Sequence, residues 1–259
     1  MAEISQQDLE NQYRVKQGME VIDHRIIRQL AEKYKNREDW GYDIEKEESV
    51  LRKITFKSIA FQIERYLDSL ELREDLLRDK EVLDIGSGNN LFGEYIEMKY
   101  GTRYTALDVD LTALRDHSEA VVADARHLPF KDNQFDLVMS KSSMPHVLAP
   151  HEAEAGDLKP YNENERQEIL KSILSVFREA YYVTKKQVRL DTFSDAEINS
   201  HVEDRKRNNL LPHVTELTTK SRERVSIVKE ALSIFEAETG AQCVFKDEEK
   251  GGLIIITKK

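Results

Sequence analysis

From Glu81 onward, short apolar segments alternate with helical patterns, and this alternation restricts the fold more than any other feature of the sequence. Strands are expected at residues 81–85, 103–108, 120–125, 135–140 and 187–193. Strands that alternate with helices typically form a mostly parallel, doubly wound α/β sheet. Near the end of the chain, two apolar segments joined by Gly251 and Gly252 predict a hairpin, which adds an antiparallel strand.

The expected sheet also predicts where a ligand would bind. In doubly wound sheets, ligands bind at the carboxyl ends of the strands, near the point where the strand order reverses. The loops after Ile85, Leu107, Val122 and Met139 therefore form the predicted site.

The first part of the chain carries helical patterns and no strand pattern. We predict a helical N-terminal cap over residues 1–79 and a Rossmann-like core over residues 80–259. Tyr34, Trp40 and Tyr42 flank a break between two helical patterns, where they would close over a bound ligand or pack in the core. A second role for the cap is homodimerisation through its apolar stripe, which contains Met19, Ile22, Ile26 and Leu30.

The composition restricts the partners and the compartment. The formal net charge of −10 disfavours binding to the phosphate backbone of nucleic acids. The one cysteine, Cys243, fits a reducing compartment, and the polar N-terminus shows no signal peptide. The longest strongly apolar run, "LIIIT", is too short to span a bilayer. We therefore expect a cytoplasmic protein without a membrane or nucleic-acid partner.

The segment "LDIGSGNNL" places Gly86 and Gly88 in a turn between a strand and a helix. In one interpretation the glycines only make a tight turn, and Asn89 or Asn90 caps the helix. The position of the turn favours a ligand site, because N–H groups at a helix N-terminus bind polar or anionic groups. A nicotinamide dinucleotide would need glycine at position 91, where this chain has Leu91.

Three carboxylates follow the expected strands and indicate a different nucleoside. Asp84 stands two residues before the first glycine, where it would meet a cationic group. Asp108 ends the second strand and would accept both ribose hydroxyls, with Asp110 as its rival. Asp124 ends the third strand and would accept a hydrogen bond from an exocyclic amine. The predicted ligand thus carries an amine, a ribose and an adenine.

Four segments, in order and spacing, resemble the successive motifs of class I S-adenosylmethionine-dependent methyltransferases. They are "VLDIGSGNN", "YTALDVD", "VVADARHLPF" and "DNQFDLVMSKSSMPHV". The nearest resemblance is to the group that includes the ubiquinone and menaquinone biosynthesis methyltransferases. It implies a seven-stranded sheet and S-adenosyl-L-methionine as the cofactor. The chain departs from the family at Asn90, where a third glycine is usual.

The resemblance also implies a role for each matched residue. Asp84, Gly86 and Gly88, with Ser87 between the glycines, would line the methionine end of the cofactor. Asp108 would bind the ribose and Val109 would pack on the adenine, whose edge Asp124 and Ala125 would contact. Ser140 would lie near the methionine and the substrate.

Methyl transfer from a sulfonium depends mainly on the positioning of the two reactants, so no protein nucleophile is required. His146 is the candidate general base for an acceptor that must lose a proton, although a histidine that only supports its loop explains it equally well. Lys141 would orient an acidic substrate or face solvent. The segment "PHEAEAGD" adds His151, Glu152, Glu154 and Asp157 without a recognised ligand spacing, so we predict no metal.

The acceptor is predicted by elimination. The chain lacks the Asn/Asp-Pro-Pro-Tyr/Phe motif of amino-methyltransferases and the cysteine pair used for pyrimidine C5 methylation. We therefore expect methylation of an O or N atom of a small molecule. A methyltransferase directed at RNA or protein, and a non-catalytic S-adenosylmethionine-binding module, are the alternatives.

Overall fold

The computed structural model describes residues 6–36, 38–43, 48–89, 91–112, 114, 119–144, 161–192, 214–248 and 251–259. Within these ranges, no helix is both long enough and apolar enough to cross a membrane.

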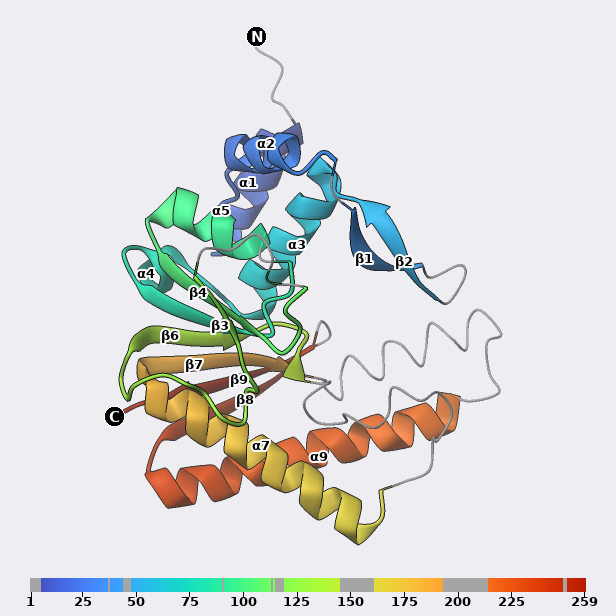
Figure 1. Ribbon diagram of the computed structural model, residues 1–259, viewed down its shortest axis with the longest axis vertical. Coiled ribbons are helices and arrows are strands. Elements are labelled where there is room, and N and C mark those ends of the chain that lie inside the picture. The colour runs from blue at the N-terminus through green and yellow to red at the C-terminus, as the bar shows by residue number, and fades with distance from the viewer. Residues whose placement is uncertain are drawn as a thin grey trace.

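A seven-stranded sheet lies at the centre of the described structure, with helices on both faces (Figure 1). The strand order is β5-β4-β3-β6-β7-β9-β8, in which β9 pairs antiparallel with β7 and β8 and the other pairs are parallel. The strands are β3 (Glu81–Ile85), β4 (Arg103–Asp108), β5 (Ala120–Val122), β6 (Phe135–Ser140), β7 (Thr184–Thr192), β8 (Gln242–Glu248) and β9 (Gly251–Thr257). The predicted doubly wound, mostly parallel sheet with an antiparallel C-terminal hairpin is confirmed.

Strand β5 ends earlier than the sequence pattern predicts, at Val122 rather than at residue 125. The side chain of Asp124 causes this difference, because its Oδ1 accepts the backbone N–H of Arg126 at 2.9 Å. An aspartate that bonds the backbone two residues further on forms a turn, which competes with continued strand pairing.

One face of the sheet is covered by helices from the N-terminal part of the chain and by the helix after β3 (Figure 1). These helices are α2 (His24–Lys33), α3 (Phe56–Ser69), α4 (Glu74–Leu77) and α5 (Leu91–Tyr100). Helix α1 (Gln6–Lys16) joins α3 through a salt bridge of 2.6 Å between Arg14 and Asp68. Ile22 and Leu30 are each 1% exposed and pack in the same core as Val82 of β3. The apolar stripe expected to form a dimer surface is therefore buried within the single chain.

The other face is covered by α7 (Glu163–Val183) and α9 (Val214–Thr239), which pack against the strands in a second core (Figure 1). Asn162 and Glu165 form a capping box at the start of α7, which satisfies the free N–H groups of its first turn. Sheets of this kind need apolar helices on both faces, because parallel strands bury both of their surfaces.

The prediction of an all-helical segment over residues 1–79 is wrong in one respect, because a two-stranded hairpin follows α2. Its strands are β1 (Glu38–Asp43) and β2 (Glu48–Lys53), which pair antiparallel. The sequence pattern would also allow a helix from Leu51, but α3 begins only at Phe56, since Thr55 and Ser58 form a capping box that fixes its start. Apolar residues three apart, such as Leu51 and Ile54, fit a helix by spacing alone, so the pattern did not separate strand from helix there.

Candidate active site

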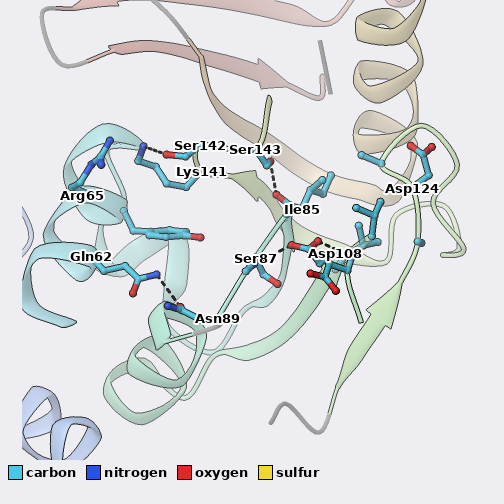
Figure 2. Close-up of a pocket in the computed structure, with 18 of the residues that line it drawn as sticks. Gln62, Arg65, Ile85, Ser87, Asn89, Asp108, Asp124, Lys141, Ser142 and Ser143 are labelled. Atoms are coloured by element: carbon cyan, nitrogen blue, oxygen red, sulfur yellow. Dashed lines mark hydrogen bonds between the residues drawn. The ribbon is translucent and has the colours of Figure 1, made fainter. Parts of the chain in front are cut away.

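The strand order reverses between β3 and β6, and the carboxyl ends of the parallel strands border a cavity of about 1050 Å³ there (Figure 2). This position agrees with the rule that ligands bind at the switch point of a doubly wound sheet. Most of the residues predicted to bind the cofactor line this cavity. They are Gly86, Ser87, Gly88, Asp108, Val109, Asp124 and Ala125.

The glycine turn after β3 has the backbone conformation that requires glycine. Gly86 has a φ of +70° and Gly88 a φ of +56°, which L-residues with a Cβ rarely adopt. The N–H groups of Gly86 and Ser87 donate to the carbonyl of Leu107 at 2.7 and 3.1 Å, so the turn is fixed to the end of β4. A Cβ on Gly86 would overlap the side chain of Ser143, with Oγ only 2.6 Å away. The turn is therefore held between β4 and the loop after β6.

Asp108 lies at the centre of the cavity wall, beside the glycine turn (Figure 2). Its Oδ2 accepts the N–H of Gly88 at 3.1 Å, and its Oδ1 accepts the N–H of Asp110 at 3.0 Å. These bonds hold the carboxylate in one orientation before any ligand binds. Asp110 also lines the cavity, but its carboxylate accepts the N–H and hydroxyl of Thr112 on the exposed side of the loop.

Asp124 lines the cavity further along the same edge (Figure 2). Both of its oxygens accept hydrogen bonds from the guanidinium of Arg126, at distances of 2.5 to 3.0 Å. The hydrogen bonds from Arg126 lower the pKa of the Asp124 carboxyl below its usual range. A ligand amine that used this carboxylate would therefore share it with Arg126.

Asp84 does not line the cavity, although it was expected to meet the methionine end of the cofactor. It is fully buried beneath the glycine turn, and Tyr104 donates to its Oδ2 at 2.7 Å. Its Oδ1 has no hydrogen-bond partner among the described residues. Burial raises the pKa of Asp84 to about 7, because removal from water disfavours the charged form. Both faces of β3 are buried, and Asp84 lies on the same face as Val82, which packs in the core shared with the N-terminal helices.

The loop after β6 forms the opposite wall of the cavity through Lys141, Ser142 and Ser143. The predicted residue Ser140 is fully buried and not among the lining residues, and its Oγ bonds to the hydroxyl of Ser143. Ser143 in turn donates to the carbonyl of Ile85 at 2.9 Å (Figure 2). Ser140 thus supports the loop, while the next three residues reach the cavity.

Lys141 is buried, with its Nζ paired to the carboxylate of Asp191 on β7. The same Nζ donates to the hydroxyl of Ser142 at 2.8 Å, and Asp191 accepts the N–H of Ser142 as well. Ser142 has a φ of +60°, a strained conformation for a residue with a Cβ. The predicted solvent-facing lysine is therefore not found, because Lys141 is buried at the cavity wall and Asp191 balances its charge.

Helix α3 supplies a wall that the motifs did not predict, formed by Phe61, Gln62, Arg65 and Tyr66. Gln62 donates to the side chain of Asn89 at 3.0 Å, which joins the helix to the glycine turn (Figure 2). Phe61 and Arg65 are one helical turn apart, and this spacing was the available signal for a shared face.

Three other predictions fall outside the described residues. They are the general base His146, the departure at Asn90, and the acidic segment with His151, Glu152, Glu154 and Asp157. Among the residues that the structure does describe, no group of three His, Cys, Asp or Glu side chains is placed to hold a metal ion.

Comparison with known families connects this cavity to a chemistry. Residues 83–155, which run from within β3 past the end of β6 and include the loops after β3, β4 and β5, match the methyltransferase domain family. This region is a methyltransferase domain. The predicted class I S-adenosylmethionine-dependent methyltransferase is thereby confirmed at the level of the family. The narrower likeness to the ubiquinone and menaquinone group stays a prediction.

Two curated relatives match part of this chain. Both are named arginine-hydroxylase NDUFAF5, mitochondrial, one from Danio rerio and one from Homo sapiens. Each is 35% identical over 68 residues, which is 24% of this chain and 21% or 20% of the relative. The match therefore spans only about a fifth of the length of these relatives.

Several solved methyltransferase structures are similar in arrangement. The plantazolicin methyltransferase BpumL in complex with SAH is 11% identical, covers 79% of this chain and 90% of its own, and has a TM-score of 0.47. A SAM-dependent methyltransferase from Methanosarcina mazei is 18% identical, with 72% and 94% covered and a TM-score of 0.41. Magnesium protoporphyrin IX methyltransferase from Synechocystis, with bound SAH, is 11% identical, with 78% and 83% covered and a TM-score of 0.44.

The methyltransferase domain has polar groups that fit the predicted cofactor. The hydroxyl of Ser87 is buried at 3% exposure and lacks a hydrogen-bond partner among the described residues, although the residue lines the cavity. Buried polar atoms without a partner are rare in folded proteins, so such an atom marks a place where a ligand can bond. Leu107, Val109 and Ala125 add apolar surface next to Asp108, which suits a nucleoside base beside a ribose.

Proposed function

We propose that this protein transfers a methyl group from S-adenosylmethionine to an O or N atom of a small-molecule acceptor. One observation carries the proposal. The strands of the matched methyltransferase domain end at a single cavity, where a glycine turn and an oriented aspartate lie side by side. The roles below are part of this proposal.

The residues of the cavity would hold the cofactor from its nucleoside end. Asp108 would accept the two ribose hydroxyls, with its carboxylate already oriented by the N–H groups of Gly88 and Asp110. Val109 and Ala125 would pack on the adenine. The hydroxyl of Ser87 would bond the amino-acid part of the cofactor, which reaches the turn at Gly86. When bound, S-adenosylmethionine supplies a methyl group on a positively charged sulfur.

Catalysis by this chain would consist mainly of positioning. The wall formed by Lys141, Ser142 and Ser143 is rigid, because Asp191 and Ile85 fix two of its members through hydrogen bonds. A fixed wall restricts the approach of the acceptor, which lowers the entropy barrier to the transfer. For an acceptor that must lose a proton, we propose His146, which follows this wall in the sequence, as the base.

The direct test is a titration with S-adenosylhomocysteine, the demethylated cofactor, on the wild type and on Asp108→Ala. A charged hydrogen bond contributes roughly 1.5–3 kcal/mol, so we expect the substitution to weaken binding at least about tenfold. Asp110→Ala is the matched control, since it removes a carboxylate from the same loop and should change the dissociation constant by less than about threefold. Equal affinities of the wild type and Asp108→Ala would contradict the assignment, and a larger loss in Asp110→Ala would transfer the ribose role to Asp110.

A second candidate function is the methylation of a protein side chain. Its support is the name of the curated relatives, which are arginine hydroxylases, together with the matched segment that they share with this chain. An assay with radiolabelled S-adenosylmethionine would separate the candidates. Label transferred to members of a metabolite panel supports the small-molecule proposal, whereas label transferred to arginine-containing peptides or RNA supports a macromolecular acceptor. A protein that binds the cofactor and transfers no label would be a non-catalytic module.

The predicted environment of the protein also belongs to this proposal. We propose a cytoplasmic enzyme with a small-molecule acceptor and without a nucleic-acid or membrane partner, which the net charge of −10 supports. The relatives are named as mitochondrial, so cell fractionation is the experiment that decides the compartment. A homodimer stays a prediction, and it would need a surface other than the buried stripe of α2.

A further inference from the structure

Two of the three cations that line the cavity lie on a different side from the carboxylates (Figure 2), whereas Arg126 lies beside Asp124. The carboxylates of Asp108, Asp110 and Asp124 line the side formed by β4 and β5. Arg65 and Lys141 line the opposite side, formed by α3 and the loop after β6. A ligand that fits this arrangement has hydrogen-bond donors at one end and a negative charge at the other.

The three cations that line the cavity differ in their partners. Lys141 is paired with Asp191, and Arg126 is paired with Asp124. No carboxylate among the described residues lies within salt-bridge distance of Arg65, whose guanidinium lies 5.6 Å from the ring of Phe61. In a chain with a net charge of −10, a cavity-lining guanidinium without an acidic neighbour is available for a ligand.

The position of Arg65 follows from how α3 packs. Ile59 and Ile63 are fully buried against the sheet, so the opposite side of the helix faces away from the core. The hydrogen bond from Gln62 to Asn89 holds α3 against the glycine turn. The face of α3 that carries Phe61, Gln62 and Arg65 therefore borders the cavity. Phe61 stays 60% exposed there, although a large aromatic side chain is more often buried. Arg65 and Phe61 thus form a polar and planar surface at the mouth of the cavity.

We propose that this end of the cavity is a carboxylate subsite, in which the guanidinium of Arg65 binds the carboxylate and Phe61 lies beside it. The inference rests on the proposed function, which places the nucleoside at the opposite, acidic end. A guanidinium binds a carboxylate through two parallel hydrogen bonds, a geometry that an ammonium group does not offer. The carboxylate belongs either to the amino-acid part of the cofactor or to the acceptor, and the experiment has one arm for each source.

The first arm compares S-adenosylhomocysteine with its decarboxylated analogue, which lacks only the carboxylate. Calorimetry gives the affinity of both ligands for the wild type, Arg65→Gln and Lys57→Gln. Lys57→Gln is the matched control, because Lys57 lies exposed on the same helix and does not line the cavity. If the carboxylate is that of the cofactor, Arg65→Gln weakens S-adenosylhomocysteine by about tenfold or more and leaves the analogue unchanged. Lys57→Gln changes neither affinity.

The second arm applies if Arg65→Gln binds S-adenosylhomocysteine as the wild type does. The protein saturated with this ligand is then titrated with benzoate and with benzamide, its neutral isostere. An acceptor carboxylate subsite predicts that the wild type prefers benzoate and that Arg65→Gln loses this preference.

Each remaining result contradicts the inference. Arg65→Gln that matches the wild type in both arms excludes a carboxylate at Arg65, as does an equal loss for S-adenosylhomocysteine and its analogue. These results leave the proposed function intact, because the wild type still binds the cofactor. A wild type that does not bind S-adenosylhomocysteine at all contradicts the proposed function, and the subsite with it.

Discussion

At the scale of single residues, Gly86 shows that a position in a sequence motif can also depend on a contact with a residue distant in the chain. Gly86 needs its positive φ, as the sequence spacing suggested, but it also needs space, because Ser143 lies where a Cβ would be. The motif therefore serves two purposes at one residue, to make the turn and to admit the loop after β6. The close approach of Ser143 to Gly86 brings together the loops after β3 and β6, which border the same cavity.

The contact at Gly86 leads to a prediction about stability. Gly86→Ala should lower the free energy of unfolding by roughly 2–5 kcal/mol, from the strained backbone and the overlap with Ser143 together. Gly240→Ala is the matched control, since it has a φ of +66° and open space around its Cα. The control should lose only the backbone part, roughly 1–2 kcal/mol. Urea unfolding measures both, and equal losses would show that Ser143 moves aside.

Asp84 gives a prediction about pH. Burial raises its pKa to about 7 in the folded protein, above the ordinary value of 3.8. Between these two values the folded state binds more protons than the unfolded state, so the free energy of unfolding falls as the pH rises. The slope from this one group is at most about 1.4 kcal/mol per pH unit. This slope vanishes below the ordinary pKa of 3.8, where Asp84 is protonated in both states, and above about 7, where it is ionised in both.

The measurement is urea unfolding at several pH values from about 4 to 8, on the wild type and on Asp84→Asn. The amide does not titrate, so the unfolding free energy of the wild type minus that of Asp84→Asn should fall between about pH 4 and 7 and then level off. Parallel curves would mean that Asp84 titrates at the same pH in both states.

At the scale of elements, the carboxyl ends of β6 and β7 are joined by one buried cluster. The side chains of Lys141 and Asp191 are only 6% and 11% exposed, and Asp191 also fixes the backbone of Ser142. A buried ion pair seldom adds stability relative to apolar residues, so its presence at a cavity wall suggests a role in shaping that wall.

The cluster predicts a strongly non-additive pair of substitutions. Asp191→Leu leaves the buried charge of Lys141 without an acidic partner and should lower the free energy of unfolding by about 3–5 kcal/mol. The double variant Lys141→Met with Asp191→Leu removes both charges and should lose clearly less than the single variant. Chemical unfolding of the wild type, the two single variants and the double variant gives the coupling energy. Additive losses would show that the two charges do not stabilise each other.

At the scale of the whole molecule, the N-terminal helices belong to the same folding unit as the sheet. Their apolar residues share a core with β3, β4 and β6, and Arg189 of β7 donates to the carbonyl of Leu70 at the end of α3, at 2.6 Å. The predicted boundary at residue 79 therefore marks where the recognised sequence motifs begin. It does not separate two cores, because residues on both sides of it pack in one core.

This shared core predicts one unfolding transition. Ile63→Ala and Leu190→Ala remove fully buried side chains from opposite faces of the sheet, and each should cost about 2–5 kcal/mol. The fluorescence of Trp40, the one tryptophan, reports the N-terminal part, and circular dichroism reports the whole chain. Both probes should shift together in both variants. Separate midpoints would show that residues 1–79 unfold on their own.

The sequence alone determined the sheet, the glycine turn, the family and most of the residues that line the cavity. These features depend on local patterns, namely the period of apolar residues and the order of motifs at strand ends, which can be recognised without knowing what lies nearby. Only the tertiary structure decided that Asp84 is buried, that Ser140 supports its loop, and that Glu38–Asp43 and Glu48–Lys53 pair as antiparallel strands. The wall of α3 and the pairing of Lys141 with Asp191 also depend on residues distant in the chain. Such contacts follow from the way the helices and strands pack, which no local pattern records.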